Sequence, residues 1–270
     1  MPYTLTRLPF PPAVRHLVLE ARAVLATARD DSYVRLRLVE AQPDELAGFI
    51  APGGGDHVRV VVGSPEGGTV ALHDDGQPIG EARTETVVDH SFDEGWIDLD
   101  VLVHGAPGSE LGVIGAWAAR APLGSPAVMM GPKGSVVLSG APGEVVLAGD
   151  DSALPAVRRY LRMLGPSITG HLLLETRFDL AALGIEPPAG VRVSILPPDA
   201  DPSADAGALQ GNVPSAALVR ALRGLPAPTE PLERFVFACG EQSIVAPGRA
   251  LLADWGIDVE RAVLKGYWKR

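Results

Sequence analysis

The chain has 270 residues, enough for two domains of ordinary size, and 46% of them are hydrophobic, which is ample for a core in each. Its formal net charge of −10 argues against a nucleic-acid-binding protein, and its single cysteine, Cys239, excludes intramolecular disulfides and thiolate zinc clusters. No apolar run is long enough for a signal sequence or a membrane span, so we expect a cytoplasmic protein.

The first half of the chain alternates apolar and polar residues, which is typical of half-buried strands. In one such segment Val34, Leu36 and Leu38 lie on one face, against Arg35 and Arg37. Strands are expected at 20–26, 33–39, 57–62, 69–73, 83–89, 96–103 and 127–130, with one helix near 111–120. Several short strands separated by Gly- and Pro-rich turns predict an antiparallel barrel or sandwich.

The pattern changes after the stretch GPKGSVVLSGAPGE, which we interpret as a domain junction. Short apolar strands are expected at 145–148, 171–175, 191–196, 235–239 and 262–264, and helices at 153–164, 214–223 and 244–255. This alternation predicts a parallel sheet with helices on both faces. The loop at 197–212 follows a strand, so it either contributes to a ligand crevice or is a plain linker.

The common nucleotide and hydrolase signatures are missing from the sequence. It has no G-x-G-x-x-G, no Walker lysine loop and no G-x-S-x-G. Its six histidines are scattered without metal-ligand spacing, so we expect no metal site.

Two weak motifs in the first half suit a phosphate-bearing ligand. Arg83 and Thr86 offer a guanidinium for phosphate and a hydroxyl for a heterocycle. The segment 112–121 places a glycine-rich turn before a helix, where free backbone N–H groups suit a diphosphate. Taken alone, this segment is equally an ordinary turn followed by an amphipathic helix.

Two strand-turn-helix units in the second half end in small polar turns. Asp150 and Ser152 follow one expected strand, and the turn from Gly240 to Ser243 follows another. These residues either cap the next helix or face a ligand at the carboxyl edge of the sheet. The basic C-terminus, with Lys265 and Lys269, either attracts an anionic ligand or is a solvated tail.

Taken in order, these segments resemble the siderophore-interacting protein family, relatives of ferredoxin and flavin reductases that bind FAD and reduce ferric siderophores. The matching stretches are ELAGFIAPGGGDHVRVVV, ARTETVV, WIDLDVLVHG, GAWAARA, MMGPKGS, VVLAGDDSALPAVRRYL, FVFACGEQSI and VLKGYWKR. The resemblance spans residues 18 to 270 approximately. It implies a six-stranded antiparallel barrel of ferredoxin-reductase type that binds FAD at 1–140, and a parallel-sheet α/β domain that uses NAD(P)H at 141–270.

The resemblance also implies roles for individual residues. Arg83 would contact the FAD diphosphate, and Thr86 the flavin ring. The implied cofactor-binding residues are Arg83, Thr86, Val87, His104, Gly105, Gly112, Gly115, Ala116, Trp117, Asp150, Ser152, Gly240 and Ser243. The implied substrate-binding residues, near a small anionic ferric siderophore, are Lys265, Tyr267, Trp268 and Lys269.

Three positions depart from the family pattern. Glu85 stands where the family has a tyrosine that stacks on the flavin, Val88 where it has a second arginine, and Gly115 where it has a serine. The lost stacking, cation and hydroxyl each cost on the order of 1 to 3 kcal/mol of FAD binding.

Two functions therefore stay open at this point. One is an FAD-containing, NAD(P)H-dependent ferric-siderophore reductase. The other is a flavin-free homologue that uses the same fold in small-molecule biosynthesis, for example as a cyclase, or as a small-molecule-binding protein. In the flavin-free case Glu85 either serves as the catalytic acid or base or is a solvent-facing carboxylate of its strand.

Overall fold

The computed structural model describes residues 2–105, 111–198 and 216–269, and within it the chain divides into two compact units. The barrel unit holds Arg7–Val137 and Phe178–Leu183, and the α/β unit holds Met1–Thr6, Leu138–Arg177 and Gly184–Arg270. Each unit thus takes in a short segment from the other half of the chain. The division into two domains, 1–140 and 141–270, therefore stays a prediction.

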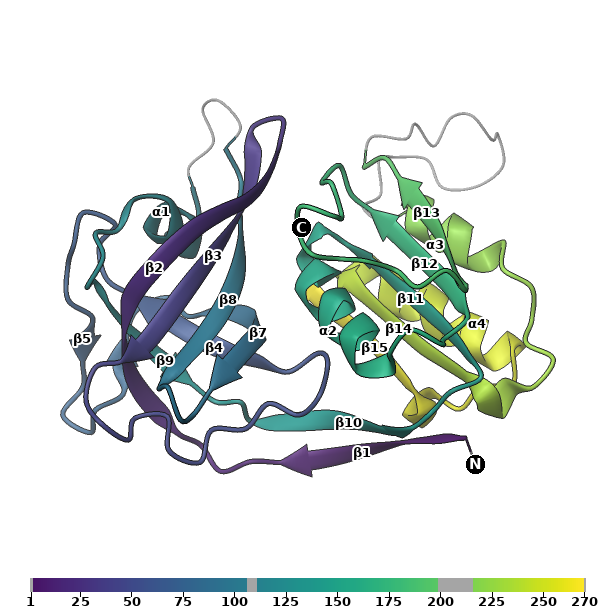
Figure 1. The fold of residues 1–270 in the computed structure, drawn as a ribbon, viewed down its shortest axis with the longest axis horizontal. Helices are drawn as coiled ribbons and strands as arrows, with labels where there is room; N and C mark the ends of the chain where they lie inside the picture. The colour runs from purple at the N-terminus through teal and green to yellow at the C-terminus, as the bar shows by residue number, and fades with distance from the viewer. Residues whose placement is uncertain (1, 106–110, 199–215, 270) are drawn as a thin grey trace. The chain divides into compact units, whose positions relative to one another are not determined.

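The barrel unit is a closed antiparallel barrel with strand order β2-β3-β8-β7-β4-β9 (Figure 1). Its elements are β2 (Val14–Ala28), β3 (Asp31–Glu40), β4 (His57–Val62), β7 (Arg83–Ser91), β8 (Trp96–Val103), α1 (Val113–Arg120) and β9 (Pro126–Met130). The six-stranded barrel predicted from the resemblance is therefore confirmed, because every expected strand but one contributes to it.

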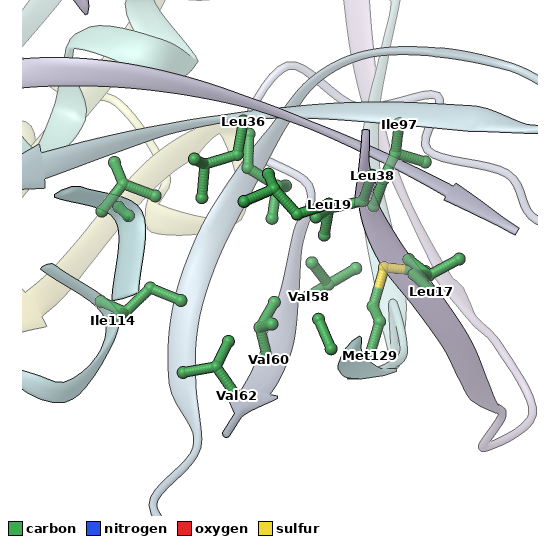
Figure 2. Close-up of a cluster of buried hydrophobic side chains, with 14 of the residues drawn as sticks. Leu17, Leu19, Leu36, Leu38, Val58, Val60, Val62, Ile97, Ile114 and Met129 are labelled. Atoms are coloured by element: carbon green, nitrogen blue, oxygen red, sulfur yellow. The ribbon is translucent and has the colours of Figure 1, made fainter. Parts of the chain in front are cut away.

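The alternation of apolar and polar residues places apolar side chains inside this barrel and charged side chains on its outer face. Figure 2 shows leucine side chains of β2 and β3 and valine side chains of β4 gathered in one cluster, together with Ile97 of β8, Met129 of β9 and Ile114 of α1. On the polar face Arg35 makes two hydrogen bonds to Asp100, at 2.7 and 2.8 Å, and Arg37 does the same to Asp98, at 2.8 Å each. The period of two thus decides which side chains are buried and which pair across the strands.

The α/β unit has a five-stranded parallel sheet with strand order β13-β12-β11-β14-β15 (Figure 1). Its strands are β11 (Glu144–Asp150), β12 (Gly170–Glu175), β13 (Val191–Leu196), β14 (Arg234–Glu241) and β15 (Ala262–Trp268). Its helices are α2 (Leu154–Leu164), α3 (Ala216–Arg223) and α4 (Val245–Asp254), with short 3-10 turns η1 (Asp151–Ala153), η3 (Pro231–Glu233), η4 (Gln242–Ile244) and η5 (Val259–Arg261). The strand order reverses between β11 and β14, which is where open parallel sheets bind ligands.

The stretch GPKGSVVLSGAPGE, where a domain junction is expected, contains a strand, and the boundary between the two units falls inside that strand, between Val137 and Leu138. β10 (Gly134–Gly140) pairs with β1 (Tyr3–Pro9), which the sequence did not predict. Tyr3 is 1% exposed, and its hydroxyl donates hydrogen bonds to the carbonyl oxygens of Arg234, at 2.8 Å, and Arg261, at 3.0 Å. The N-terminus is thus fixed by partners far along the chain, which no local pattern reveals.

The expected strand at 69–73 is also corrected. Only β5 (Ala71–Leu72) forms there, and it pairs with β6 (Pro78–Ile79) outside the barrel. Leu72 is 43% exposed, so no core selects a longer strand. The loop expected at 197–212 lies almost wholly outside the described residues, as does the start of the helix expected at 214–223. In the described ranges, no helix has the length and apolarity that a membrane crossing requires.

Candidate functional site

The first candidate site lies at the start of β7 in the barrel unit. Opposite residues of an antiparallel ladder share a face of the sheet. Glu85 lies opposite Val58, and Arg83 lies opposite Val60, and both valines belong to the barrel core. The register therefore places Arg83 and Glu85 on the core-facing side of β7, with Glu85 the deeper of the two.

Glu85 has an unusual protonation state. Part of its side chain is exposed, but its carboxyl group is surrounded by protein, and this desolvation raises its pKa to about 8 against the smaller, opposing effect of Arg83. At pH 7 the carboxyl is thus mostly neutral and carries a proton. A neutral carboxyl can donate a hydrogen bond or a proton, which an ordinary surface glutamate cannot do.

The residues that follow Glu85 hold the strand in place. Val87 is fully buried in the barrel core, and its N–H donates to the carbonyl of Asp56 at 3.1 Å. Thr86 is buried opposite His57. The side chain of Val87 is thus enclosed by the core, so we infer that it supports the site and does not contact a ligand.

The glycine-rich turn before α1 has the features that an anion requires. Gly112 is the N-cap residue, and no side chain caps the helix, so its first N–H groups have no side-chain acceptor. A Cβ atom placed on Gly112 would meet nothing within 4 Å. Open space and uncapped N–H groups together suit the diphosphate of a nucleotide cofactor.

The helix behind this turn is anchored in the barrel. Ala116 and Trp117 are buried, and Trp117 belongs to the core cluster with Ile114. The indole N–H of Trp117 has no hydrogen-bond partner among the described residues. Because its ring is enclosed, we infer that Trp117 fixes the turn and does not touch a ligand. At Gly115 a Cβ would lie 3.9 Å from Val103, an ordinary contact, so a side chain fits there.

His104 and Gly105 lie together just after β8. The Gly105 N–H donates to the Asp31 carboxylate at 3.1 Å, and His104 Nδ1 lies 3.5 Å from the same oxygen. A Cβ on Gly105 would approach the Asp30 carbonyl oxygen to 1.9 Å. Glycine is therefore required for this backbone contact, whether or not a cofactor lies along it.

The second candidate site is the carboxyl edge of the parallel sheet, and Asp150 is its hub. Asp150 ends β11 and is 8% exposed. Its Oδ2 accepts hydrogen bonds from the Glu241 N–H at 2.8 Å and the Trp268 indole N–H at 2.9 Å. Its Oδ1 accepts from the Ser152 N–H at 2.9 Å and the Ser152 hydroxyl at 2.5 Å. The carboxylate thus links the ends of β11, β14 and β15.

Glycine is required around this hub. A Cβ on Gly240, where φ is +156°, would lie 2.6 Å from Asp150 Oδ2. A Cβ on Gly149 would lie 2.4 Å from the Cβ of Ala153. The predicted cofactor-binding residues Asp150, Ser152 and Gly240 are therefore brought together, and the carboxylate of Asp150 is also bound by Glu241 and Trp268.

Of two further carboxylates at the same edge, Glu175 was not predicted as a site residue, and Glu241 belongs to the turn from Gly240 to Ser243 that was predicted to face a ligand. Glu175 ends β12 directly opposite Asp150 in the ladder, and burial and the charges of Asp150 and Asp151 raise its pKa to about 7. Its Oε2 is buried and has no hydrogen-bond partner among the described residues. Glu241 is 5% exposed and accepts from the Ser243 N–H at 2.7 Å. The position of Glu175 at the end of a strand was the signal that could have identified it.

The predicted substrate residues lie on β15 and just after it. Lys265 is opposite Cys239 in the ladder, and desolvation lowers the pKa of its ammonium group. Burial raises the pKa of the Cys239 thiol to about 12 and that of the Tyr267 hydroxyl well above its usual value. Cys239 is thus an inert buried thiol. Trp268 is 40% exposed although its indole N–H is bound to Asp150, and Lys269 is exposed.

The described part of the chain contains no group of three or more His, Cys, Asp or Glu side chains that could hold a metal ion. Its charged and polar groups instead suit organic ligands: Arg83 and the α1 turn each suit a phosphate, and the strand ends of the α/β unit suit a polar ligand. Arg83 and the turn at Gly112 each supply groups that fit a phosphate, while the carboxyl of Glu85 offers no aromatic surface for stacking.

Comparison with known proteins gives matches over almost the whole chain. A family model described as siderophore-interacting FAD-binding domain matches residues 12–136, and one described as siderophore-interacting protein matches residues 142–270. The ferric vibriobactin reductase ViuB of Vibrio cholerae is 26% identical over 242 residues, 84% of this chain and 81% of that protein. The uncharacterized protein Rv2895c of Mycobacterium tuberculosis is 38% identical over 114 residues, 42% of this chain, so the match spans only 38% of that protein's length.

Solved structures share the fold. A siderophore utilization protein from T. fusca superposes with a TM-score of 0.73 at 23% identity, covering 99% of this chain and 96% of that one. The cytochrome b5 reductase domain of Ulva prolifera nitrate reductase superposes with a TM-score of 0.62 at 14% identity, covering 93% and 97%. The predicted architecture, a barrel of ferredoxin-reductase type followed by a parallel-sheet α/β region, is thus confirmed.

Proposed function

Because the chain belongs to the siderophore-interacting protein family, we propose that it is an FAD-containing, NAD(P)H-dependent reductase that acts on a ferric siderophore. Most of the support comes from one observation, the turn before α1 in the barrel unit. Its first N–H groups have no side-chain acceptor and open on free space at Gly112, and Arg83 on β7 of the same unit supplies a guanidinium. The name of the relative ViuB, a ferric vibriobactin reductase, supports the choice of substrate class.

In this proposal each group of residues has a distinct task. Arg83 and the N–H groups that follow Gly112 hold the FAD diphosphate, and Thr86 borders the flavin ring. Asp150, Glu175 and Glu241 lie where an open parallel sheet binds its ligand, and there they orient the nicotinamide donor. Lys265 and Lys269 attract the anionic ferric complex. Bound FAD would supply the redox chemistry, taking electrons in pairs from NAD(P)H and passing them singly to ferric iron.

The experiment is a titration of the purified chain with FAD, followed by an assay of ferric-siderophore reduction with NADH or NADPH. We expect the flavin absorption band to stay with the protein through desalting, and ferrous iron to appear in a chelator trap only with all components present. A colourless protein that fails to bind FAD at high micromolar concentration would overturn the proposal.

A matched pair of variants tests directly whether Arg83 binds the FAD diphosphate. Arg83→Leu removes a hydrogen-bonding cation and should weaken FAD binding about tenfold to a hundredfold, since bonds to charged groups contribute about 1.5 to 3 kcal/mol. Arg59→Leu is the control, because Arg59 is an exposed arginine on the neighbouring strand β4, opposite Thr84. Equal losses in the two variants would show that general positive charge, and not Arg83, holds the diphosphate.

The desolvated carboxyl of Glu85 favours a second candidate, a flavin-free acid or base catalyst. A carboxyl with a pKa of about 8 in a barrel site holds its proton at neutral pH and can deliver it to a bound small molecule. This candidate predicts that the chain binds no FAD and that Glu85→Gln abolishes turnover of the true substrate. The FAD titration above separates the two candidates.

A further inference from the structure

Arg83 lies between two carboxyl groups on one stretch of chain. Glu81 Oε1 is 2.7 Å from Arg83 Nη2, and both of these side chains are largely exposed. Glu85 is two residues further along β7, on the same face of the strand as Arg83 and opposite the buried Val58. The guanidinium thus pairs with the exposed carboxylate of Glu81 and acts electrostatically on the desolvated carboxyl of Glu85, two residues along the same face.

Few other described charges face Glu85 from the strands packed against β7. On β4, the His57 ring is 3.1 Å from the Gly55 carbonyl, and Arg59 is exposed opposite Thr84, on the other face. On β8, Asp98 and Asp100 are each occupied by two hydrogen bonds, from Arg37 and Arg35 respectively.

On β7 itself, Asp89 lies beyond Val87, across a register shift of the ladder. Arg83 is therefore the cation that offsets the burial of the Glu85 carboxylate.

We infer that binding of a diphosphate ligand at Arg83 is proton-linked, because Glu85 keeps or takes up a proton when the phosphate pairs with the Arg83 guanidinium. This inference rests on the FAD site proposed above. A phosphate that pairs with Arg83 neutralises the positive charge that stabilises the Glu85 carboxylate, and it adds negative charge near that carboxylate. Both effects disfavour the carboxylate, so the ligand and the neutral carboxyl stabilise each other.

The size of the effect follows from the pKa of about 8 in the free protein. If the ligand binds only the neutral form, its affinity is proportional to the fraction of Glu85 that carries a proton. That fraction is about nine tenths at pH 7 and about one tenth at pH 9, so the affinity should fall roughly tenfold between them.

The test measures the dissociation constants of FAD and of ADP at pH 7, 8 and 9, for the wild type and two variants. The wild type should lose about tenfold in affinity across this range for both probes. Glu85→Gln, which keeps a neutral group of the same shape, should bind equally at all three values. Glu81→Gln is the matched control: it frees Arg83 of its exposed partner, so it should bind more tightly throughout but keep the slope.

Calorimetry of the wild type at pH 8, in two buffers with different ionisation enthalpies, gives a second measurement that needs no variant. We expect about half a proton to be taken up per FAD bound. Three results would each overturn the proton linkage and leave the reductase proposal standing: an FAD affinity that does not change with pH, binding without proton uptake, or the same pH dependence of affinity in Glu85→Gln as in the wild type. Failure of FAD to bind at any pH would overturn both.

Discussion

Replacement of Asp150 by asparagine should destabilise the α/β unit strongly. The buried carboxylate accepts two hydrogen bonds on each oxygen, from Glu241 and Trp268 on one side and from Ser152 on the other. An asparagine side chain has one acceptor oxygen, so its NH₂ group must face one of these two donor pairs. Since each bond to a charged acceptor contributes about 1.5 to 3 kcal/mol, two lost bonds should cost about 3 to 6 kcal/mol of unfolding free energy.

Urea unfolding of wild type and Asp150→Asn measures this loss. Amide hydrogen exchange should show at the same time which segment loosens, and we expect faster exchange at the end of β15, where Trp268 loses its acceptor. Asp258→Asn is the matched control, because Asp258 is exposed and accepts a single N–H, from Glu260 at 2.9 Å. Asparagine caps a helix nearly as well as aspartate, so the control should lose less than about 1 kcal/mol. If Asp150→Asn loses no more than this control, the hub does not hold the three strand ends together.

Three further predictions concern the barrel unit. Gly53→Ala should cost more than about 3 kcal/mol in chemical unfolding, because its Cβ would lie 2.6 Å from atoms of both Asp56 and Ser135; a loss under about 1 kcal/mol would contradict this close packing. Gly115→Ala should instead raise the unfolding free energy by up to about 1 kcal/mol, since it adds helix propensity where a Cβ has room, and a lower melting temperature would show that the turn needs glycine. The folded-state pKa of Glu85, about 8, is above the ordinary value of 4.5, so the unfolding free energy of the wild type should fall by at most about 5 kcal/mol as pH rises from 4.5 to 8, and then level off. Glu85→Gln should remove this pH dependence. If the stability curves of wild type and variant run parallel, the carboxyl of Glu85 is not desolvated.

Much of the fold could be predicted from local sequence patterns. The alternation of Val34, Leu36 and Leu38 with Arg35 and Arg37 sets the two faces of β3, and the structure places the leucines in the core and the arginines in cross-strand pairs. The apolar strands of the second half likewise form the parallel sheet. Such patterns can be read locally because burial on one face of a strand repeats every two residues.

The pairing of β1 with β10 could not be predicted in this way. The partners of Tyr3 lie 231 and 258 residues away, and nothing near Tyr3 in the sequence points to them. The segment around β10 contains several Gly and Pro residues, which are as typical of a junction as of an edge strand. Its strand character is decided by its partner.

The candidate site divides in the same manner. The amino-acid sequence alone shows which chemical groups are available: a guanidinium at Arg83, a glycine turn at Gly112, and a carboxyl at Glu85. Their state depends on the fold, since Trp117 is enclosed by the core and Glu85 keeps its proton at neutral pH. Packing and desolvation depend on every neighbour in space, and most of those neighbours are distant in the chain.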